Sequence, residues 1–160
     1  MSVFSIYVGT DQDRYSRFNS YLGGELRQSD NFDEAGNRLK DEYKGTPLMM
    51  LFEKGDLSAD REGVSLIRKE FPAVYMIVIA DKLDRDEISF YLKCGVNDTA
   101  IGDISKTRLL NGLDFVERNQ ELILSAKLDQ KPLGKYKCPL WKRAFDIAGS
   151  LLLLAILSPF

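Results

Sequence analysis

Short runs of apolar residues alternate with helical patterns along the first three quarters of the chain. Three of these runs hardly contain polar positions: Val3–Val8, Leu48–Phe52 and Val74–Ala80. Uninterrupted apolar runs of this length predict strands that are buried on both faces of a sheet. Weaker strands are predicted at Glu25–Gln28 and Thr99–Ile101.

Between these runs, apolar residues recur at spacings of three and four, which is the period of an amphipathic helix. The five helical groups are Tyr15, Phe18 and Leu22; Phe32, Ala35, Leu39 and Tyr43; Val64, Ile67 and Phe71; Ile88, Tyr91 and Leu92; and Leu109, Leu113, Val116 and Ile123. Strands and helices in alternation predict an α/β, flavodoxin-like, doubly wound fold. Its five-stranded parallel sheet is expected in the order 2-1-3-4-5.

Composition and charge exclude several functional classes. The chain of 160 residues has no histidine, so the commonest general base and zinc ligand is missing. Cys94 and Cys138 are too far apart to form a metal-binding or redox motif, and two lone cysteines favour a reducing cytosol. Residues 130–160 carry five basic groups and one acid, giving +4, so the net charge of −2 leaves −6 for residues 1–129. An acidic body of this kind predicts no nucleic-acid partner.

The segment from Pro47 to Ile101 resembles bacterial receiver domains, the phosphoacceptor modules of two-component signalling. The matching stretches read PLMMLFE, REGVSLIRKEFP, VYMIVIAD and YLKCGVNDTAI. The resemblance places Glu53 where that family has its phosphoacceptor aspartate, Ala80 where it has Ser or Thr, and Gly102 where it has a lysine. It also implies a receiver-like fold.

The acidic pair that binds Mg²⁺ in that family is replaced by Gly9-Thr10, with Asp11 and Asp13 close behind. Phosphoryl transfer needs an acceptor carboxylate, a divalent cation and a further group for the developing charge. We therefore expect a degenerate phosphoacceptor site that is not phosphorylated. Glu53 is then either a solvated acid at a strand end or an imitation of a phosphoaspartate. Asp11, Asp13 and Glu53 are either unlinked surface acids or a loose cation site.

A second resemblance lies in the segment KRAFDIAGSLLLLAILSPF. It resembles the start of bacterial sugar transferases, the monotopic phosphoglycosyl transferases that load a sugar phosphate onto a polyprenyl-phosphate lipid. The positions that carry the resemblance are Lys142, Arg143, Asp146, Ser158 and Pro159, and Trp141 is expected at the membrane interface. The uncharged run 147–160 is shorter than the ~20 residues of a spanning helix, and Pro159 interrupts a helix, so a re-entrant segment is expected. A buried C-terminal helix, or one that pairs with a partner, is the alternative.

The two resemblances predict residues 1–130 as a receiver-like regulatory domain, 131–140 as a linker and 141–160 as a membrane-associated helix that opens a truncated sugar transferase domain. We expect this regulatory domain to belong to a membrane-bound sugar-phosphate transferase that initiates capsule, exopolysaccharide or O-antigen synthesis. The expected location is the cytoplasmic face of the bacterial inner membrane, with residues 1–130 in the cytosol.

The expected partners are membrane lipid, the downstream transferase domain and, as one possibility, a second copy of the chain in a homodimer. The catalytic Asp-Glu pair of the transferase family is not found before Phe160, so activity of this chain alone is not expected and no catalytic residue or metal ligand is assigned. Mg²⁺ is expected only for the missing catalytic domain. The alternatives are a free-standing pseudo-receiver module with a membrane anchor, and a functional response-regulator receiver, against which Glu53 and Ala80 argue.

Overall fold

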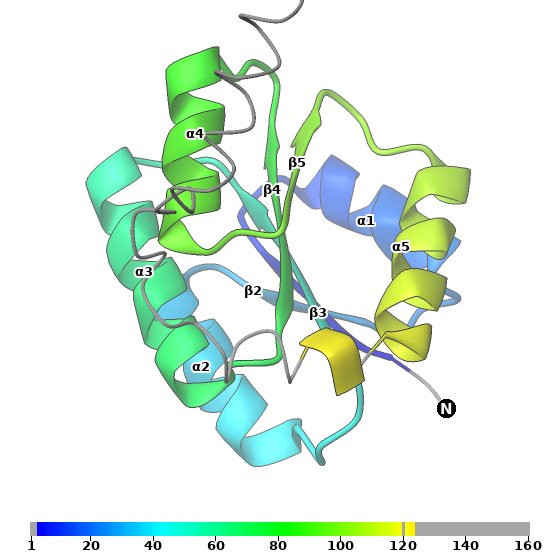
Figure 1. Cartoon of the computed structure of the whole chain (residues 1–160). Coiled ribbons are helices and arrows are strands. Elements are labelled where there is room, and N and C mark those ends of the chain that lie inside the picture. Colours follow the sequence, from blue (N-terminus) through cyan, green and yellow to red (C-terminus); the bar gives the residue numbers. More distant parts are fainter. Residues whose placement is uncertain (1–2, 120, 124–160) are drawn as a thin grey trace, which may run out of the picture. The chain divides into compact units, whose positions relative to one another are not determined.

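The computed structural model describes residues 3–119 and 121–123 (Figure 1). Its five strands are β1 (Phe4–Val8), β2 (Leu26–Ser29), β3 (Leu48–Glu53), β4 (Tyr75–Ala80) and β5 (Asp98–Ile101). They form one parallel sheet in the order β2-β1-β3-β4-β5, which confirms the predicted fold and strand order. β3 is therefore the middle strand with β1 and β4 beside it, and all three end at the same edge of the sheet.

Five helices cover the sheet on both faces. They are α1 (Gln12–Tyr21), α2 (Phe32–Glu42), α3 (Leu57–Glu70), α4 (Arg85–Cys94) and α5 (Lys106–Arg118). Figure 1 shows α2, α3 and α4 on one face and α1 and α5 on the other. Each helix begins at a residue whose side-chain oxygen accepts a backbone N–H of the first turn, and these caps are Asp11, Asn31, Asp56, Asp84 and Ser105.

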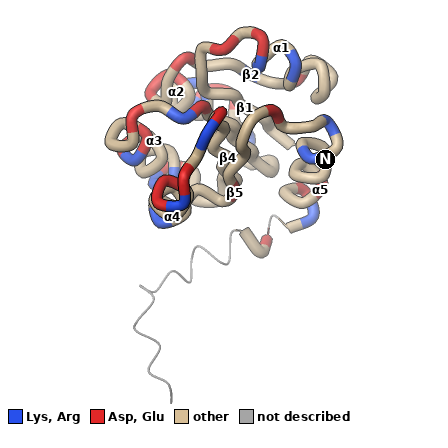
Figure 2. The backbone as a smooth tube through the Cα atoms, turned by 90° about the horizontal axis from the view of Figure 1, so that it is seen from above, with Lys and Arg blue, Asp and Glu red and all other residues tan. Residues whose placement is uncertain are grey.

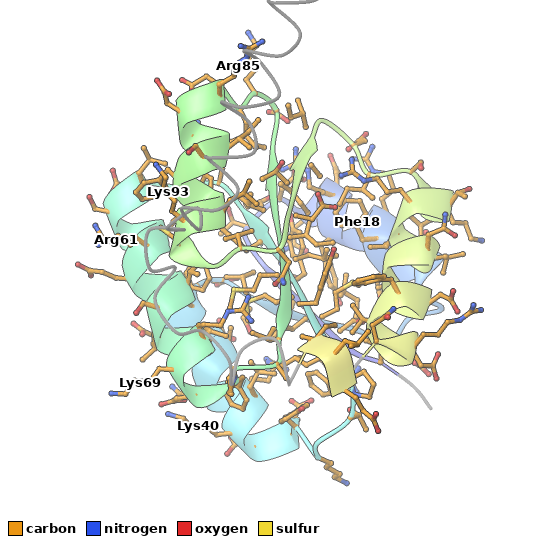
Figure 3. The ribbon with its side chains drawn as sticks, in the orientation of Figure 1. Phe18, Lys40, Arg61, Lys69, Arg85 and Lys93 are labelled. Atoms are coloured by element: carbon orange, nitrogen blue, oxygen red, sulfur yellow. The ribbon has the colours of Figure 1, made fainter. Side chains whose placement is uncertain are left out.

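The core consists of two apolar clusters, one on each face of the sheet. Met50 and Phe52 point to the side of α2, α3 and α4, whereas Met49 and Leu51 point to the side of α1 and α5. All four side chains are fully buried, which explains why this strand shows no polar alternation in the sequence. Phe18 of α1 is likewise fully buried and lies against the sheet (Figure 3).

The element boundaries differ from the sequence prediction at a few positions. β1 begins at Phe4 and β4 begins at Tyr75, one residue later than predicted in each case. The predicted last helix is divided: α5 ends at Arg118, where Asn119 donates its N–H to Phe115 O, and residues 121–123 are helical again, with Ile123 donating its N–H to Asn119 O at 2.9 Å. Ile123 therefore lies beyond α5.

All described residues belong to the first of the two units into which the chain divides, residues 1–128. In that described part, no helix has both the length and the apolar character needed to span a membrane. The predicted linker 131–140 and the predicted membrane segment 141–160 lie outside the described residues. The same holds for Trp141, Lys142, Arg143, Asp146, Ser158 and Pro159.

Candidate functional site

The candidate site lies at the carboxyl ends of β1, β3 and β4, the edge of a parallel α/β sheet at which ligands and reacting groups usually gather. Glu53 is the last residue of β3, Ala80 is the last residue of β4, and Gly9 follows β1 directly. The parallel pairing of these three strands brings their ends together, although the positions are far apart in the sequence.

The carboxylate of Glu53 is held by three donors from the β1–α1 part of the chain. Tyr7 Oη donates to Oε1 at 2.5 Å, the Thr10 backbone N–H donates to Oε2 at 3.0 Å, and Arg14 Nη1 donates to Oε1 at 3.2 Å. The Glu53 side chain is only 19% exposed. Glu53 is therefore not the solvated strand-end acid that was one of the two sequence-based interpretations.

Tyr7 is the buried partner in this group. It lies in β1 with a fully buried side chain, opposite Leu51 in the neighbouring strand. Burial raises the pKa of its hydroxyl well above the usual value, and the hydrogen bond to the Glu53 carboxylate raises it further. The Tyr7 hydroxyl is thus a neutral donor to Glu53 at neutral pH.

Arg14 of α1 lies between carboxylates from three different segments. Its guanidinium contacts Glu53 at 3.2 Å, Asp81 Oδ1 at 2.9 Å and Asp11 Oδ2 at 3.7 Å. The side chain is 13% exposed, and although burial disfavours its charge, the surrounding oxygens raise the Arg14 pKa above its usual value. A permanently protonated guanidinium thus lies among acidic oxygens where a divalent cation would otherwise be attracted.

Gly9 gives the Glu53 carboxylate the space that it occupies. A β-carbon added at Gly9 would lie 2.4 Å from Glu53 Oε2, closer than any real contact of such atoms. Because the carboxylate lies directly over the backbone at the end of β1, its Oε2 atom can accept the Thr10 N–H. The extra methylene of glutamate therefore turns the carboxylate toward β1 and α1.

The remaining predicted site residues take different places. Asp11 caps α1 and accepts the Arg14 backbone N–H at 2.9 Å, whereas Asp13 is exposed in the first turn of α1. Ala80 supplies no hydroxyl, and Gly102 follows β5 and donates its N–H to Ala80 O at 2.8 Å. Within residues 3–119 and 121–123, no group of three acidic or cysteine side chains is arranged to hold a metal ion. The loose cation site of Asp11, Asp13 and Glu53 is therefore not assembled.

The loop after β3 is connected to α4. Lys54, next to Glu53, forms an ion pair with Glu87 in the first turn of α4. Asp60 of α3 is buried and accepts both the Gly55 N–H at 2.9 Å and Tyr91 Oη of α4 at 2.6 Å. The end of β3 is thus fixed on one side to α1 through Glu53 and on the other side to α4 through Lys54.

Sequence reasoning missed Tyr7 and Arg14. Tyr7 stands inside an apolar run and has the same appearance as a core residue, while Arg14 is one of several charged residues in a surface helix. The available signal was positional: the end of β1 and the first turn of the following helix face the end of β3 in a doubly wound sheet. A hydroxyl and a guanidinium at those two places are within reach of Glu53.

Comparison with known proteins gives a likeness of fold. No protein-family model matches the chain, and no curated protein matches it at a significant level. Among solved structures, a response regulator from Thermotoga maritima has a TM-score of 0.64 and 17% identity, covering 74% of this chain and 99% of that one. The beryllofluoride-activated NtrC4 receiver domain dimer has a TM-score of 0.63 and 15% identity, covering 75% of this chain and 99% of that one.

A third structure, the CheY-like protein tadZ from Pseudomonas aeruginosa, has a TM-score of 0.60 and 14% identity, covering 72% of this chain and 99% of that one. Each match covers nearly the whole of the solved structure, and sequence identity this low supports a likeness of fold alone. The described residues of this chain have the fold of a receiver domain.

Proposed function

We propose that the receiver-like domain is a regulatory module that does not accept phosphate and that holds one arrangement of its β1, β3 and β4 ends without a chemical signal. The observation that carries this proposal is the position of Arg14, whose guanidinium contacts Glu53, Asp11 and Asp81. Phosphoryl transfer to a carboxylate requires a divalent cation beside the acceptor. A fixed guanidinium at that place repels such a cation.

The state of Glu53 supports the same proposal. Its two oxygens already accept three hydrogen bonds, from Tyr7, Thr10 and Arg14. A carboxylate that is engaged in this way is a poor nucleophile, because attack on phosphorus would break those bonds first. Ala80 brings no hydroxyl and Gly102 no ammonium group to stabilise the transferred phosphoryl oxygens.

Mass spectrometry after incubation with a phosphodonor tests this function. The full chain is incubated with acetyl phosphate and Mg²⁺, and the intact mass is measured with and without EDTA. We expect no gain of a phosphoryl group in either sample. A Mg²⁺-dependent adduct that disappears in Glu53→Gln would overturn the proposal and favour a functional response-regulator receiver.

The C-terminal sequence bears on what the domain regulates. The sequence 141–160, with Lys142-Arg143, Asp146 and Ser158-Pro159, resembles the membrane-associated start of phosphoglycosyl transferases. We propose that residues 1–130 are the cytosolic regulatory domain of such a transferase, at the cytoplasmic face of the membrane, in the synthesis of a bacterial polysaccharide. Partners of the domain are then the transferase itself, lipid, or a second copy of the chain. A free-standing module with a membrane anchor is the second candidate, and it shares the same C-terminal segment.

Liposome flotation tests the membrane part separately. The full chain is compared with a version that ends at Gln130, in low and in high salt. We expect the full chain to float with the vesicles in both conditions, because burial of the apolar run 147–160 outweighs the contribution of the basic residues. The shorter version is expected to stay in the aqueous fraction. If the full chain also stays there, the membrane function is wrong, whatever the result at Glu53.

A further inference from the structure

The sheet has two edge strands, β2 and β5, and each of them has a neighbouring strand on one side only. Figure 2 shows them at opposite ends of the sheet, with β1 and β4 between them. In an edge strand every second residue turns its N–H and C=O groups away from the sheet, where they can pair with a strand of another molecule. The partners of these outward groups therefore decide whether the sheet can add a strand.

Side chains of α1 occupy the outward groups of Leu26 in β2. The Gly9 N–H donates to Ser29 O at 3.0 Å, so Ser29 faces β1 and, by alternation along the strand, Leu26 faces outward. Asn19 Oδ1 accepts the Leu26 N–H at 3.1 Å, and Tyr15 Oη donates to the Leu26 carbonyl at 3.2 Å. Because these two α1 residues are about one helical turn apart, they reach both peptide groups of a single residue.

The outward groups of Thr99 in β5 are occupied in the same way. The Gly102 N–H donates to Ala80 O at 2.8 Å, so Gly102 faces β4 and Thr99 faces outward. Asp98 Oδ1 accepts the Thr99 N–H at 2.8 Å, and Arg108 Nη2 of α5 donates to the Thr99 carbonyl at 3.0 Å. Arg108 Nη2 also donates to Asp98 Oδ2 at 3.2 Å, which keeps the acid in place. At each edge, one acceptor and one donor side chain thus take the place of the peptide groups of a neighbouring strand.

Little of either edge stays open. β2 and β5 have four residues each, so each strand has two outward-facing residues, and one of the two is capped. Gln28 and Ile101 are the others, and their peptide N–H and C=O groups have no partner among the described residues. The next N–H after β2, that of Asp30, donates to Glu34 Oε2 at 2.8 Å. A strand added to β2 or β5 would therefore find two free peptide groups, where an uncapped edge of the same length offers four.

We infer that the side chains of Tyr15, Asn19, Asp98 and Arg108 close the sheet against pairing with a second copy of the chain. A strand of that copy could pair fully only after these side-chain hydrogen bonds had been broken. None of the four residues donates to the Glu53 carboxylate, so their removal leaves the basis of the proposed function unchanged. With both sheet edges closed, a partner of the domain contacts its helices or loops.

The β5 edge is tested in the full chain with Asp98→Ala and Arg108→Ala together, which uncap Thr99 and leave the net charge unchanged. Asp114→Ala with Arg118→Ala is the matched control, because it removes an exposed ion pair within α5. Amide hydrogen exchange and sedimentation velocity are measured over a range of protein concentrations. At low concentration we expect the Thr99 amide of the edge variant to exchange about tenfold faster than in the unaltered chain, which is the upper range for one net hydrogen bond. As the concentration rises, this amide should become protected again while the sedimentation coefficient increases.

The β2 edge is tested separately with Asn19→Ala and Tyr15→Phe together, which uncap Leu26. The matched control is Ser16→Ala with Tyr21→Phe, two α1 residues whose hydroxyls have no hydrogen bond among the described residues. We expect the Leu26 amide to behave as the Thr99 amide does at the other edge. Circular dichroism shows whether each variant is folded, and if one is not, the other edge decides. All variants keep residues 124–160, so association through that segment is common to all of them.

Three results would overturn the inference. Faster exchange that does not depend on protein concentration, without a change in sedimentation, would mean that the four side chains make local hydrogen bonds and nothing more. Concentration-dependent protection of the Gln28 and Ile101 amides in the unaltered chain would show that the edges pair despite their caps. Equal association of the edge variants and their controls would indicate a cause outside the sheet edges. In each case the proposals on Glu53 and on the membrane segment would be unaffected.

Discussion

Gly9 and Glu53 approach so closely that a β-carbon on Gly9 would lie 2.4 Å from Glu53 Oε2. Gly9, the first residue after β1, thus leaves the space that the Glu53 carboxylate occupies. The contact also shows how a glutamate at the end of β3 is accommodated. The carboxylate turns over the glycine and reaches Tyr7, Thr10 and Arg14.

Gly9→Ala should therefore displace the Glu53 carboxylate and break its hydrogen bonds. We expect the free energy of unfolding to fall by about 1–3 kcal/mol, measured by urea denaturation with circular dichroism. Gly112→Ala is the control, because a β-carbon there meets nothing within 4 Å and the position is inside α5. Alanine at that helical position should be neutral or slightly stabilising. Equal stability of the two variants would contradict the close contact between Gly9 and the Glu53 carboxylate.

Arg14→Ala tests the cation at the centre of the site. Its removal leaves the partly buried Glu53 carboxylate without its ion pair, and we expect a loss of about 1–3 kcal/mol in the free energy of unfolding. The contact with the exposed Asp81 should contribute little of this, because water screens it. Arg118→Ala is the control, since it removes an exposed pair with Asp114 on α5 and should change stability by less than about 1 kcal/mol. A result in which both variants behave alike contradicts the central place of Arg14.

The close packing of α2 on α3 gives a prediction away from the site. A β-carbon on Gly63 of α3 would lie 2.2 Å from the Phe32 ring, whereas one on Gly36 of α2 would meet only Ile67 Cδ1 at 3.5 Å. Gly63→Ala should force the ring or the helix to move and lower the melting temperature, at about 1–3 kcal/mol in free energy. Gly36→Ala should leave it nearly unchanged or raise it. The reverse order of the two melting temperatures would contradict the helix packing.

The ion pair of Lys54 and Glu87 makes stability depend on pH. The hydrogen bond from Lys54 lowers the pKa of the Glu87 carboxyl in the folded state, and the Arg14 backbone N–H lowers the pKa of Asp11 in the same direction. A carboxyl with a lowered folded pKa adds stability above its unfolded pKa, near 4, and that stability is lost as the pH falls through the folded pKa. The free energy of unfolding should therefore fall as the pH is lowered.

Lys54→Met should make this decline shallower, because only the hydrogen bond from the Asp84 backbone N–H then still lowers the folded pKa of Glu87. The measurement is the free energy of unfolding from neutral pH down to about pH 3 for the unaltered chain and the variant. The two curves should approach each other at the acid end. Lys106→Met, which removes a lysine without an ion pair in the described residues, is the control and should run parallel to the unaltered chain. Parallel curves for Lys54→Met would contradict the pair.

The fold could be predicted from the sequence because each strand and helix is specified by residues that are close neighbours in the sequence. Leu48–Phe52 and Val74–Ala80 are apolar throughout, and the helices between the strands repeat at three and four residues, so period and order together define the sheet. The site could be predicted only in its position. Glu53 was placed at the strand end correctly, yet its partners Tyr7 and Arg14 are 46 and 39 residues away, and no periodic signal connects them. Their role depends on strand register, which the pattern does not specify at the level of single side chains.

The most direct test of the account is a titration of the isotope-labelled chain with Mg²⁺, followed by the backbone amide signals of Gly9, Thr10 and Lys54, with NaCl of equal ionic strength as the control. If the Arg14 guanidinium takes the place of a cation beside Glu53, these signals should shift no more with Mg²⁺ than with NaCl. A saturable Mg²⁺-specific shift at these three amides would contradict the account, because it would show a metal bound at the end of β3 despite the guanidinium.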